Sequence, residues 1–219
     1  MTNNPQFQRP TLNFRGRKSP LTLTIGILVI LGAVFTAVSG FYADWLWFKS
    51  VNFTSTWSTV LGTKAMLFVV IGLITALFVM FNVLLAYKRR PLYVPMTIEA
   101  DNLERYRSQI EPIRRGVFMA GFLALFYFAG TSGSTLWSTW LLFRNSTEFG
   151  VKDPQFNMDI SFFAFRLPFW QTLIGWGIST LVLSIIASVA VHYLYGGIRL
   201  QVREDRTTVA ARVQLSVLL

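Results

Sequence analysis

Four long apolar runs dominate this sequence and set the environment in which it folds. They cover residues 21–48, 61–87, 117–143 and 167–195, and each is at least as long as the about 20 residues that cross a bilayer core. In lipid, an open segment satisfies its own backbone only as a helix, and no recurring alternation suggests a barrel. The sequence therefore predicts an all-α integral membrane protein with four transmembrane helices.

Loops and chain ends surround these spans. A basic N-terminus at 1–20 precedes the first two predicted spans, at 21–48 and 61–87, which an outer loop at 49–60 connects. A cytoplasmic loop at 88–116 leads to the other two spans, at 117–143 and 167–195, which an outer loop at 144–166 connects. A cytoplasmic segment at 196–219 follows. We expect Thr207 or Thr208 to cap a further membrane helix whose apolar face begins at Val209, Val213, Val217 and Leu218. Such an end leaves apolar residues without a partner, so we expect a longer polypeptide.

Basic residues fall on alternate sides of the spans. Segments 1–20, 88–116 and 196–219 hold fifteen of the chain's twenty lysines and arginines. Because positively charged loops are retained in the cytoplasm, both chain ends are expected there, in a multi-pass protein of the cell membrane. The seven tryptophans gather near the opposite helix ends, where such rings prefer the interface. They are Trp45, Trp47, Trp57, Trp137, Trp140, Trp170 and Trp176.

The net charge of +10 does not indicate a nucleic-acid-binding protein. The basic residues lie at membrane boundaries, and no RNA- or DNA-reading motif surrounds them. Attraction to anionic lipid headgroups at the cytoplasmic face accounts for the same charges. The absence of cysteine excludes disulfides, thiolate chemistry and cysteine-based metal sites. Membrane lipids are thus the expected partners.

The cytoplasmic loop at 88–116 contains an amphipathic pattern. Prolines at 91 and 95 break the chain, and apolar residues then recur at helical spacing. These are Leu103, Tyr106, Ile110 and Ile113. Glu111 and Arg115 form an acid-first pair four residues apart, which supports a helix. We favour an interfacial helix on the inner leaflet over a lever or partner-docking helix.

The outer segment from Asn145 to Trp170 has more detail than a generic loop requires. Asp153-Pro154 starts a turn, Gly150 permits one, and Pro168 stands where a helix can begin. Residues 158–165 are short, aromatic and β-prone. We therefore expect an ordered hairpin or platform on the outer helix ends.

Two groups of residues carry a resemblance to a known family. A Trp-Phe pair, Trp47 and Phe48, follows the first span, and a DPxFxxDxSFxxFxLP pattern lies in the outer segment. The pattern consists of Asp153, Pro154, Phe156, Asp159, Ser161, Phe162, Phe165, Leu167 and Pro168. On these residues the sequence resembles uncharacterised protein family 0182, large membrane proteins of actinobacteria and cyanobacteria. The resemblance implies that this is the N-terminal membrane portion of a longer protein with further spans and a large extracytoplasmic region, and it carries over no catalytic residues.

Several polar residues are candidate sites. Asp153, Asn157, Asp159 and Ser161, with Glu148 nearby, offer oxygen atoms to a hard cation, but their spacing is not that of an EF-hand. We favour a turn capped by its own aspartates, with no metal and no cofactor. His192 is expected at a helix end or interface, and Asn82 in a hydrogen bond to another helix, because lipid exposure would be costly.

The sequence favours a non-enzymatic function. It has no phosphate-binding glycine loop, no Ser-His-Asp set, no HExxH motif and no paired intramembrane carboxylates. We expect a membrane anchor or scaffold for an extracytoplasmic domain, which family context connects with the cell envelope, and for unidentified protein partners. The alternative is a portion of a transporter or channel for a lipid or small solute. A polar internal cavity lined by Asn82 would favour the transporter, and a dry bundle with an ordered outer platform would favour the scaffold.

Overall fold

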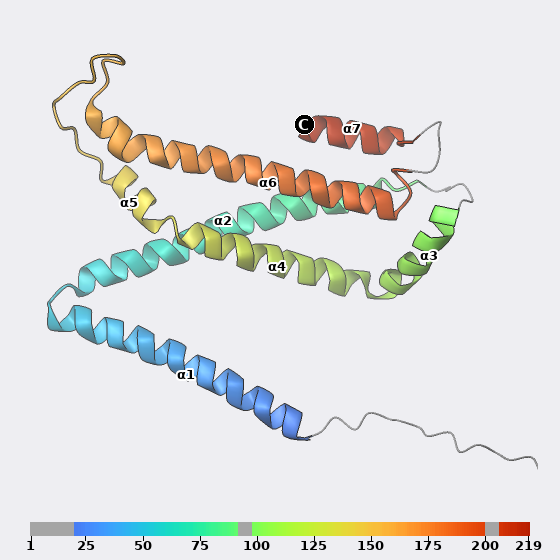
Figure 1. The fold of residues 1–219 in the computed structure, drawn as a ribbon, viewed down its shortest axis with the longest axis horizontal. Coiled ribbons are helices and arrows are strands. Elements are labelled where there is room, and N and C mark those ends of the chain that lie inside the picture. Colours follow the sequence, from blue (N-terminus) through green and yellow to red (C-terminus); the bar gives the residue numbers. More distant parts are fainter. Residues whose placement is uncertain (1–19, 92–97, 200–205) are drawn as a thin grey trace, which may run out of the picture. The chain divides into compact units, whose positions relative to one another are not determined.

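A computed structural model describes residues 20–91, 98–199 and 206–219. The basic N-terminus up to residue 19, Pro95 and Arg203 lie outside the described residues. The described ranges are helical (Figure 1), and their β-structure is limited to two isolated bridges, Lys152 with Asp159 and Ile198 with Thr207. The elements are α1 (Pro20–Ser50), α2 (Thr54–Lys88), α3 (Ile98–Ile110), η1 (Glu111–Ile113), α4 (Arg114–Ser134), α5 (Trp137–Arg144), η2 (Phe162–Arg166), α6 (Leu167–Leu194) and α7 (Val209–Leu218).

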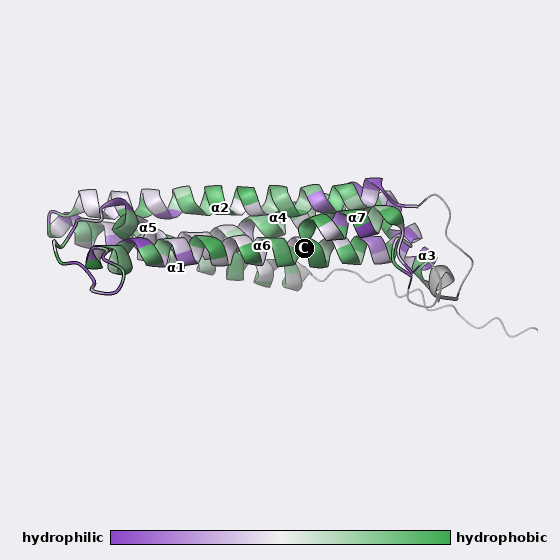
Figure 2. Ribbon diagram, turned by 90° about the horizontal axis from the view of Figure 1, so that it is seen from above, coloured by the Kyte–Doolittle hydropathy of each residue, from purple (hydrophilic) through white to green (hydrophobic). Residues whose placement is uncertain are grey.

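Four helical segments are long and apolar enough to cross a membrane, as the sequence predicts. They are Leu23–Ser50, Thr54–Lys88, Leu103–Ser134 and Phe162–Leu194. Figure 2 shows hydrophobic residues along α2, α4 and α6 and hydrophilic residues in the loops at their ends. The predicted fold class, an all-α membrane protein with four such helices, is confirmed.

The region expected as one span at 117–143 is not a single helix. α4 ends at Ser134 and α5 begins at Trp137. The hydroxyl groups of Ser134 and Thr135 donate to the carbonyls of Thr131 and Ser132. Such local bonds compete with the helical ladder and account for the break.

The chain divides into two compact units, residues 1–57 and 58–219. In the first unit, α1 turns into the start of α2 through Asn52, whose φ of 61° lies in the left-handed region that asparagine tolerates. The Phe41 and Trp57 rings meet edge to face at 5.0 Å. The Lys49 ammonium lies 4.9 Å from the centre of the Trp45 ring. Aromatic contacts thus fix this turn.

In the second unit, α2 and α4 approach closely through glycine. A β-carbon at Gly72 would lie 2.6 Å from the Phe126 carbonyl oxygen, and one at Gly130 would lie 2.8 Å from the Phe68 carbonyl oxygen. Lipid provides no hydrophobic force to join helices, so close packing of small residues stabilises the pair. The two helices therefore depend on the absence of side chains at their crossing.

A second stripe of small or polar residues faces inward from α6. The buried residues are Thr180, Ser184, Ser188 and His192, spaced every fourth position and therefore on one helix face. α7 lies along α6 (Figure 1) and buries Ala211 and Gln214.

The start of α7 agrees in part with the sequence analysis. The Thr208 side chain accepts a hydrogen bond from the Ala211 N–H, which confirms the expected cap. The valines at 209, 213 and 217 are exposed, however, so the apolar row points away from α6. Gln214 takes the inward position, because its amide has partners on α6 and α2.

We predict that Gly72→Ala or Gly130→Ala destabilises the protein. The added methyl group has no space, and overpacking of this kind costs about 1–3 kcal/mol. Thermal unfolding of the detergent-solubilised protein measures the effect. Gly175→Ala is the matched control, because its β-carbon would meet no atom within 4 Å. Equal melting temperatures for Gly130→Ala and Gly175→Ala would contradict the close approach of α2 and α4.

Candidate functional site

The signature segment, residues 149–168, is ordered by the carboxylate of Asp159. Its oxygens accept the N–H groups of Phe149 at 3.1 Å, Gly150 at 2.8 Å and Ser161 at 2.8 Å. Hydrogen bonds from Ser161, followed by those from Phe149 and Gly150, lower the pKa of Asp159 from 3.8 to about 2. The ionised carboxylate therefore joins the two ends of a loop.

Asp153 closes a tighter turn inside this loop. Its N–H donates to the Met158 carbonyl at 2.8 Å, and its carbonyl accepts from Asn157 at 2.9 Å. Asn157 has a φ of 54° and Gly150 a φ of 75°, so both occupy left-handed positions required by the turn. Pro154 stands in the turn itself. Asp153 and Asn157, two of the residues considered as cation ligands, thus lie in this turn.

The second half of the signature is helical, in contrast to the β-prone character of residues 158–165. Phe162–Arg166 form a π-helical turn in which the Leu167 N–H bonds to the Phe162 carbonyl. Pro168 follows at the start of α6. Pro168 has no N–H to donate to the helical ladder at this point, and π turns such as this one are rare.

Aromatic rings pack against one another within the signature segment. Phe165 packs against Phe149 with ring centres 5.5 Å apart, Phe156 lies 5.9 Å from Phe163, and Phe162 lies 5.4 Å from Phe163. Trp47 and Phe48 belong to the first unit, where their rings meet at 4.9 Å.

Five apolar side chains of the signature segment are exposed. They are Phe149, Val151, Phe156, Met158 and Ile160, with exposed fractions between 39% and 59%. Exposed apolar side chains on an ordered segment can mark an interaction site. We call these five residues the signature patch.

A buried polar network joins α2, α6 and α7. The His192 Nε2 and Gln214 Oε1 atoms lie 3.0 Å apart, and the Gln214 amide donates to the Asn82 carbonyl at 2.9 Å. The Asn82 side chain donates to Phe78 in its own helix at 3.0 Å. The interhelical bond at Asn82 is therefore made by its backbone and not by its amide.

His192 lies in the last turn of α6, which agrees with the expected helix-end position, but it is buried there, with an exposed fraction of 1%. A β-carbon at Gly197 would lie 2.8 Å from its Nδ1 atom, so the glycine pair after α6 covers the ring. The sequence analysis missed Gln214 and Gly197. A glutamine in an apolar helix is the signal that would have identified the first.

Trp176 also has an internal partner. Its Nε1–H donates to the Thr75 hydroxyl at 3.0 Å, so this ring is bonded to α2 and is not only part of an interfacial belt. Trp140 lies 5.6 Å from Phe169, and the Lys64 ammonium lies 5.3 Å from the Trp137 ring. These contacts attach α5 to α6 and α2.

The opposite end of the second unit carries a charged cluster around Glu111. One carboxylate oxygen accepts from Tyr87 at 2.8 Å and from Arg114, and the other lies 3.4 Å from the Tyr195 hydroxyl. The Arg90 guanidinium lies 3.5 Å from Glu111. We call this end, which includes the ends of α2 and α6, α3 and the start of α4, the basic end.

Glu111 pairs with Arg114 and not with Arg115, the partner expected from helical spacing. It lies in η1, a 3₁₀ turn with Pro112 in its first positions. Three residues per turn bring position i+3, rather than i+4, over the carboxylate. Tyr87 and Tyr195, at the ends of two other helices, complete the cluster and were missed because they are distant in sequence.

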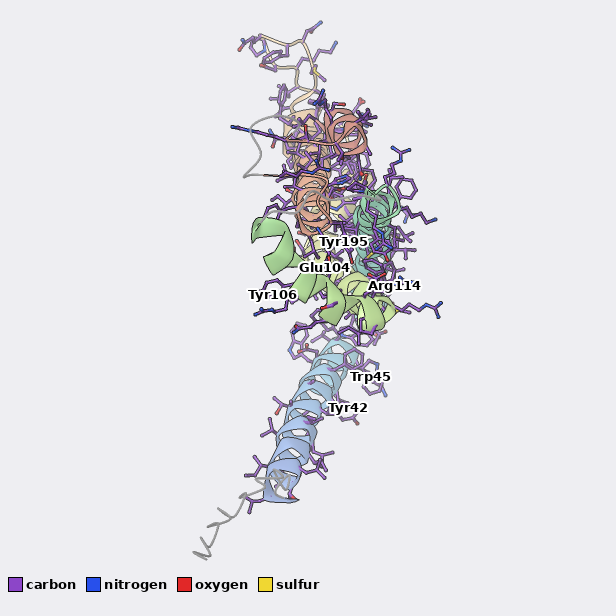
Figure 3. All side chains as sticks on the ribbon, turned by 90° about the vertical axis from the view of Figure 1, so that its right-hand side faces the viewer. Tyr42, Trp45, Glu104, Tyr106, Arg114 and Tyr195 are labelled. Atoms are coloured by element: carbon purple, nitrogen blue, oxygen red, sulfur yellow. The ribbon has the colours of Figure 1, made fainter. Side chains whose placement is uncertain are left out.

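Arg107 on α3 reaches back to α6. Its Nε donates to the Leu194 carbonyl, its Nη1 pairs with Glu104 at 3.2 Å, and its guanidinium lies 5.8 Å from the Tyr195 ring. The remaining Nη2 is buried and has no partner among the described residues. Figure 3 looks onto this end, with Glu104 on α3, Arg114 on α4 and Tyr195 after α6.

The basic end holds a polar hollow and the unit holds an apolar groove. The hollow has a volume of about 600 Å³ and is lined by Arg90, Arg107, Glu111 and Tyr195. The groove has a volume of about 650 Å³ and lies between α2, α4 and α6. Tyr195 lines both spaces.

We predict that Asp159→Asn loosens the signature segment more than Asp153→Asn, because Asp159 accepts three backbone N–H groups and Asp153 accepts one at 3.4 Å. The measurement is the hydrogen-exchange protection of the Gly150 amide, which should fall several-fold. A lowered pKa stabilises the folded state above the unfolded value of 3.8, and this contribution is lost as the pH falls toward about 2. The pH dependence of protection in that window should disappear in Asp159→Asn and remain in Asp153→Asn.

We predict that Gln214→Leu destabilises the attachment of α7. The change leaves His192 and the Asn82 carbonyl without this partner, and an unsatisfied buried polar group costs about 1–3 kcal/mol. Thermal unfolding of the full polypeptide is the measurement. Ser216→Ala is the control, since Ser216 is exposed and bonds only within α7. A Gln214→Leu protein as stable as Ser216→Ala would show that the buried polar network contributes nothing to the stability of the protein.

The comparisons agree with the signature. The model of the uncharacterised protein family UPF0182 matches residues 21–219. A UPF0182 protein of Streptomyces coelicolor is 44% identical over 93% of this chain, but over 20% of its own length. The UPF0182 protein of Salinispora tropica is 44% identical over 95% of this chain and 21% of its own length. That of Thermobifida fusca is 45% identical over 93% of this chain and 20% of its own length. The chain thus spans about a fifth of the length of these curated relatives, and no solved structure matches it. Since the family model covers nearly all of the sequence, this chain belongs to the uncharacterised protein family UPF0182.

Proposed function

We propose that this chain is a non-enzymatic membrane anchor and scaffold that presents an extracytoplasmic domain of a larger protein. The observation that carries the proposal is the signature patch, five exposed apolar side chains on a segment that Asp159 holds in shape. An ordered apolar surface next to the membrane suits a docking platform for a folded domain. The relatives, about five times as long as the matched region, supply enough polypeptide to form such a domain.

The buried polar groups also support a scaffold over a carrier of small polar solutes. Gln214 bonds to both His192 and the Asn82 carbonyl, and Trp176 bonds to Thr75. Side chains used in this way join helices and do not line a water-filled path. The groove between α2, α4 and α6 is apolar, so the transporter alternative is favoured only in the form that handles a lipid.

The proposed orientation places the basic end in the cytoplasm and the signature patch outside. Lys88, Arg89, Arg90 and Arg115 are exposed at the basic end, where they suit a cytoplasmic leaflet with anionic lipids. The signature segment contains one lysine, Lys152, and one arginine, Arg166. The proposed location is the plasma membrane.

The test is site-specific photo-crosslinking in the full polypeptide in native membranes. A photoreactive phenylalanine analogue at Phe156 should crosslink to a later part of the polypeptide or to a partner protein. The control is the same analogue at Phe81, an exposed position of α2 outside the patch. Crosslinks to lipid alone at both positions would overturn the scaffold proposal.

A topology measurement accompanies this test. The chain has no native cysteine, so in a background without other cysteines a single one at position 157 should react with an impermeant reagent in intact cells. One at position 105 should not. Labelling at 105 alone would reverse the orientation and place the signature patch in the cytoplasm.

A further inference from the structure

The groove between α2, α4 and α6 and the polar hollow of the basic end share Tyr195 as a lining residue, and neither space has a role in the anchor function. Apolar residues line the groove over most of its length, from Val117 to Ser132 on α4 and from Trp176 to Leu194 on α6. At 1.5 Å rise per residue, the α4 wall is about 22 Å long. This exceeds the depth of one leaflet, which is about 15 Å.

The few polar residues along the groove do not suit a hydrophilic ligand. The Thr75 hydroxyl accepts the Trp176 N–H, and the Ser179 hydroxyl donates to the Gly175 carbonyl in its own helix. A molecule in this part of the groove therefore meets mainly aliphatic and aromatic surface. Flexible hydrocarbon fits such a space, because it needs no polar partner.

The head of the groove has the opposite character. Arg114 lines the groove itself, and Arg90 and Arg107 line the polar hollow. Glu104 and Glu111 line the same hollow, so its two arginines and two glutamates balance in charge. Among the described residues, Arg114 at the groove adds one further positive charge.

Arg107 indicates where in the hollow an anionic group would bind. Its side chain is 13% exposed, and its buried Nη2 has no partner among the described residues. A buried guanidinium N–H without an acceptor is costly, and a phosphate oxygen would satisfy it with a charge-assisted bond. The same residue lines the hollow next to Tyr195, where the groove begins.

We propose that the groove and hollow together form a binding site for one phospholipid with an anionic headgroup. Its acyl chain lies between α4 and α6 against α2, and its phosphate lies beside Arg107 and Arg114. A transmembrane helix of the same polypeptide is the competing occupant. It is disfavoured because a helix with its side chains is about 10–12 Å wide and supplies no anion to Arg107.

The test uses the full polypeptide reconstituted in phosphatidylcholine vesicles that contain a trace of phosphatidylglycerol with a photoreactive acyl chain. Labelled peptides are located by mass spectrometry. We expect labelling on the groove walls, including the α4 peptide with Ala124 and Leu125. Excess unlabelled phosphatidylglycerol should reduce it at least fivefold, and the same excess of phosphatidylcholine should not.

Two matched variants separate the groove from the general lipid surface. Ala124→Trp fills the groove and should reduce the labelling at least fivefold. Leu123→Trp, at the same depth but on the 55% exposed side outside the groove, should leave it unchanged. A third variant, Arg107→Gln, should keep acyl labelling but remove the preference for phosphatidylglycerol over phosphatidylcholine.

Three results would overturn the proposal. Labelling that is equal inside and outside the groove, with no competition in the wild-type protein, would indicate surrounding bilayer lipid only. A photoreactive residue at Leu125 that crosslinks to a later segment of the polypeptide would show that protein fills the groove. Unchanged selectivity in Arg107→Gln would remove the headgroup assignment. The competition result does not depend on any variant, so it decides the question even if Ala124→Trp fails to fold.

Discussion

The structure of the second unit depends on the close approach of helix backbones through small residues. In a membrane the lipid chains are as apolar as leucine, so helices gain little by covering apolar surface. Gly72 and Gly130 let α2 and α4 meet with no space for a β-carbon. The serines and threonine of α6 supply a second narrow face. Among the described helices α2 has the largest number of buried residues, because both of these faces meet it or the polar network around it.

Polar groups then determine which helix lies beside which. Gln214 attaches α7 to α6 through His192 and to α2 through the Asn82 carbonyl. The Thr75 hydroxyl accepts a hydrogen bond from Trp176. Away from water, each of these groups needs a partner inside the protein. The same requirement applies to Nη2 of Arg107, which is buried and has no partner among the described residues, at a hollow that shares Tyr195 with the apolar groove.

The two ends of the unit are built by different chemistry. At the signature end, one carboxylate accepts three backbone N–H groups and so fixes a loop that exposes apolar side chains. At the basic end, Glu111 accepts hydrogen bonds from Tyr87 on α2 and Arg114 on α4, and from Tyr195 at the end of α6. The proposed platform on one side and the proposed headgroup site on the other would serve a single role, in which the chain is fixed in the bilayer and supports a domain outside it.

The sequence by itself determined the four apolar helices, a cap for α7 at Thr207 or Thr208 and the turn of Asp153. These follow from length, hydropathy and turn chemistry within a few residues, which local sequence contains. Only the tertiary structure decided that His192 is buried, that Asn82 bonds across through its backbone, and that Glu111 selects Arg114, Tyr87 and Tyr195. His192 and Gln214 are 22 positions apart, and Asn82 and Gln214 are 132 apart. Glu111 is 24 positions from Tyr87 and 84 from Tyr195, whereas its pair with Arg114 is local and depends on a 3₁₀ turn. Periodicity shows which face of a helix is apolar, but the partner of a polar group depends on which helices meet, and long-range packing alone sets that.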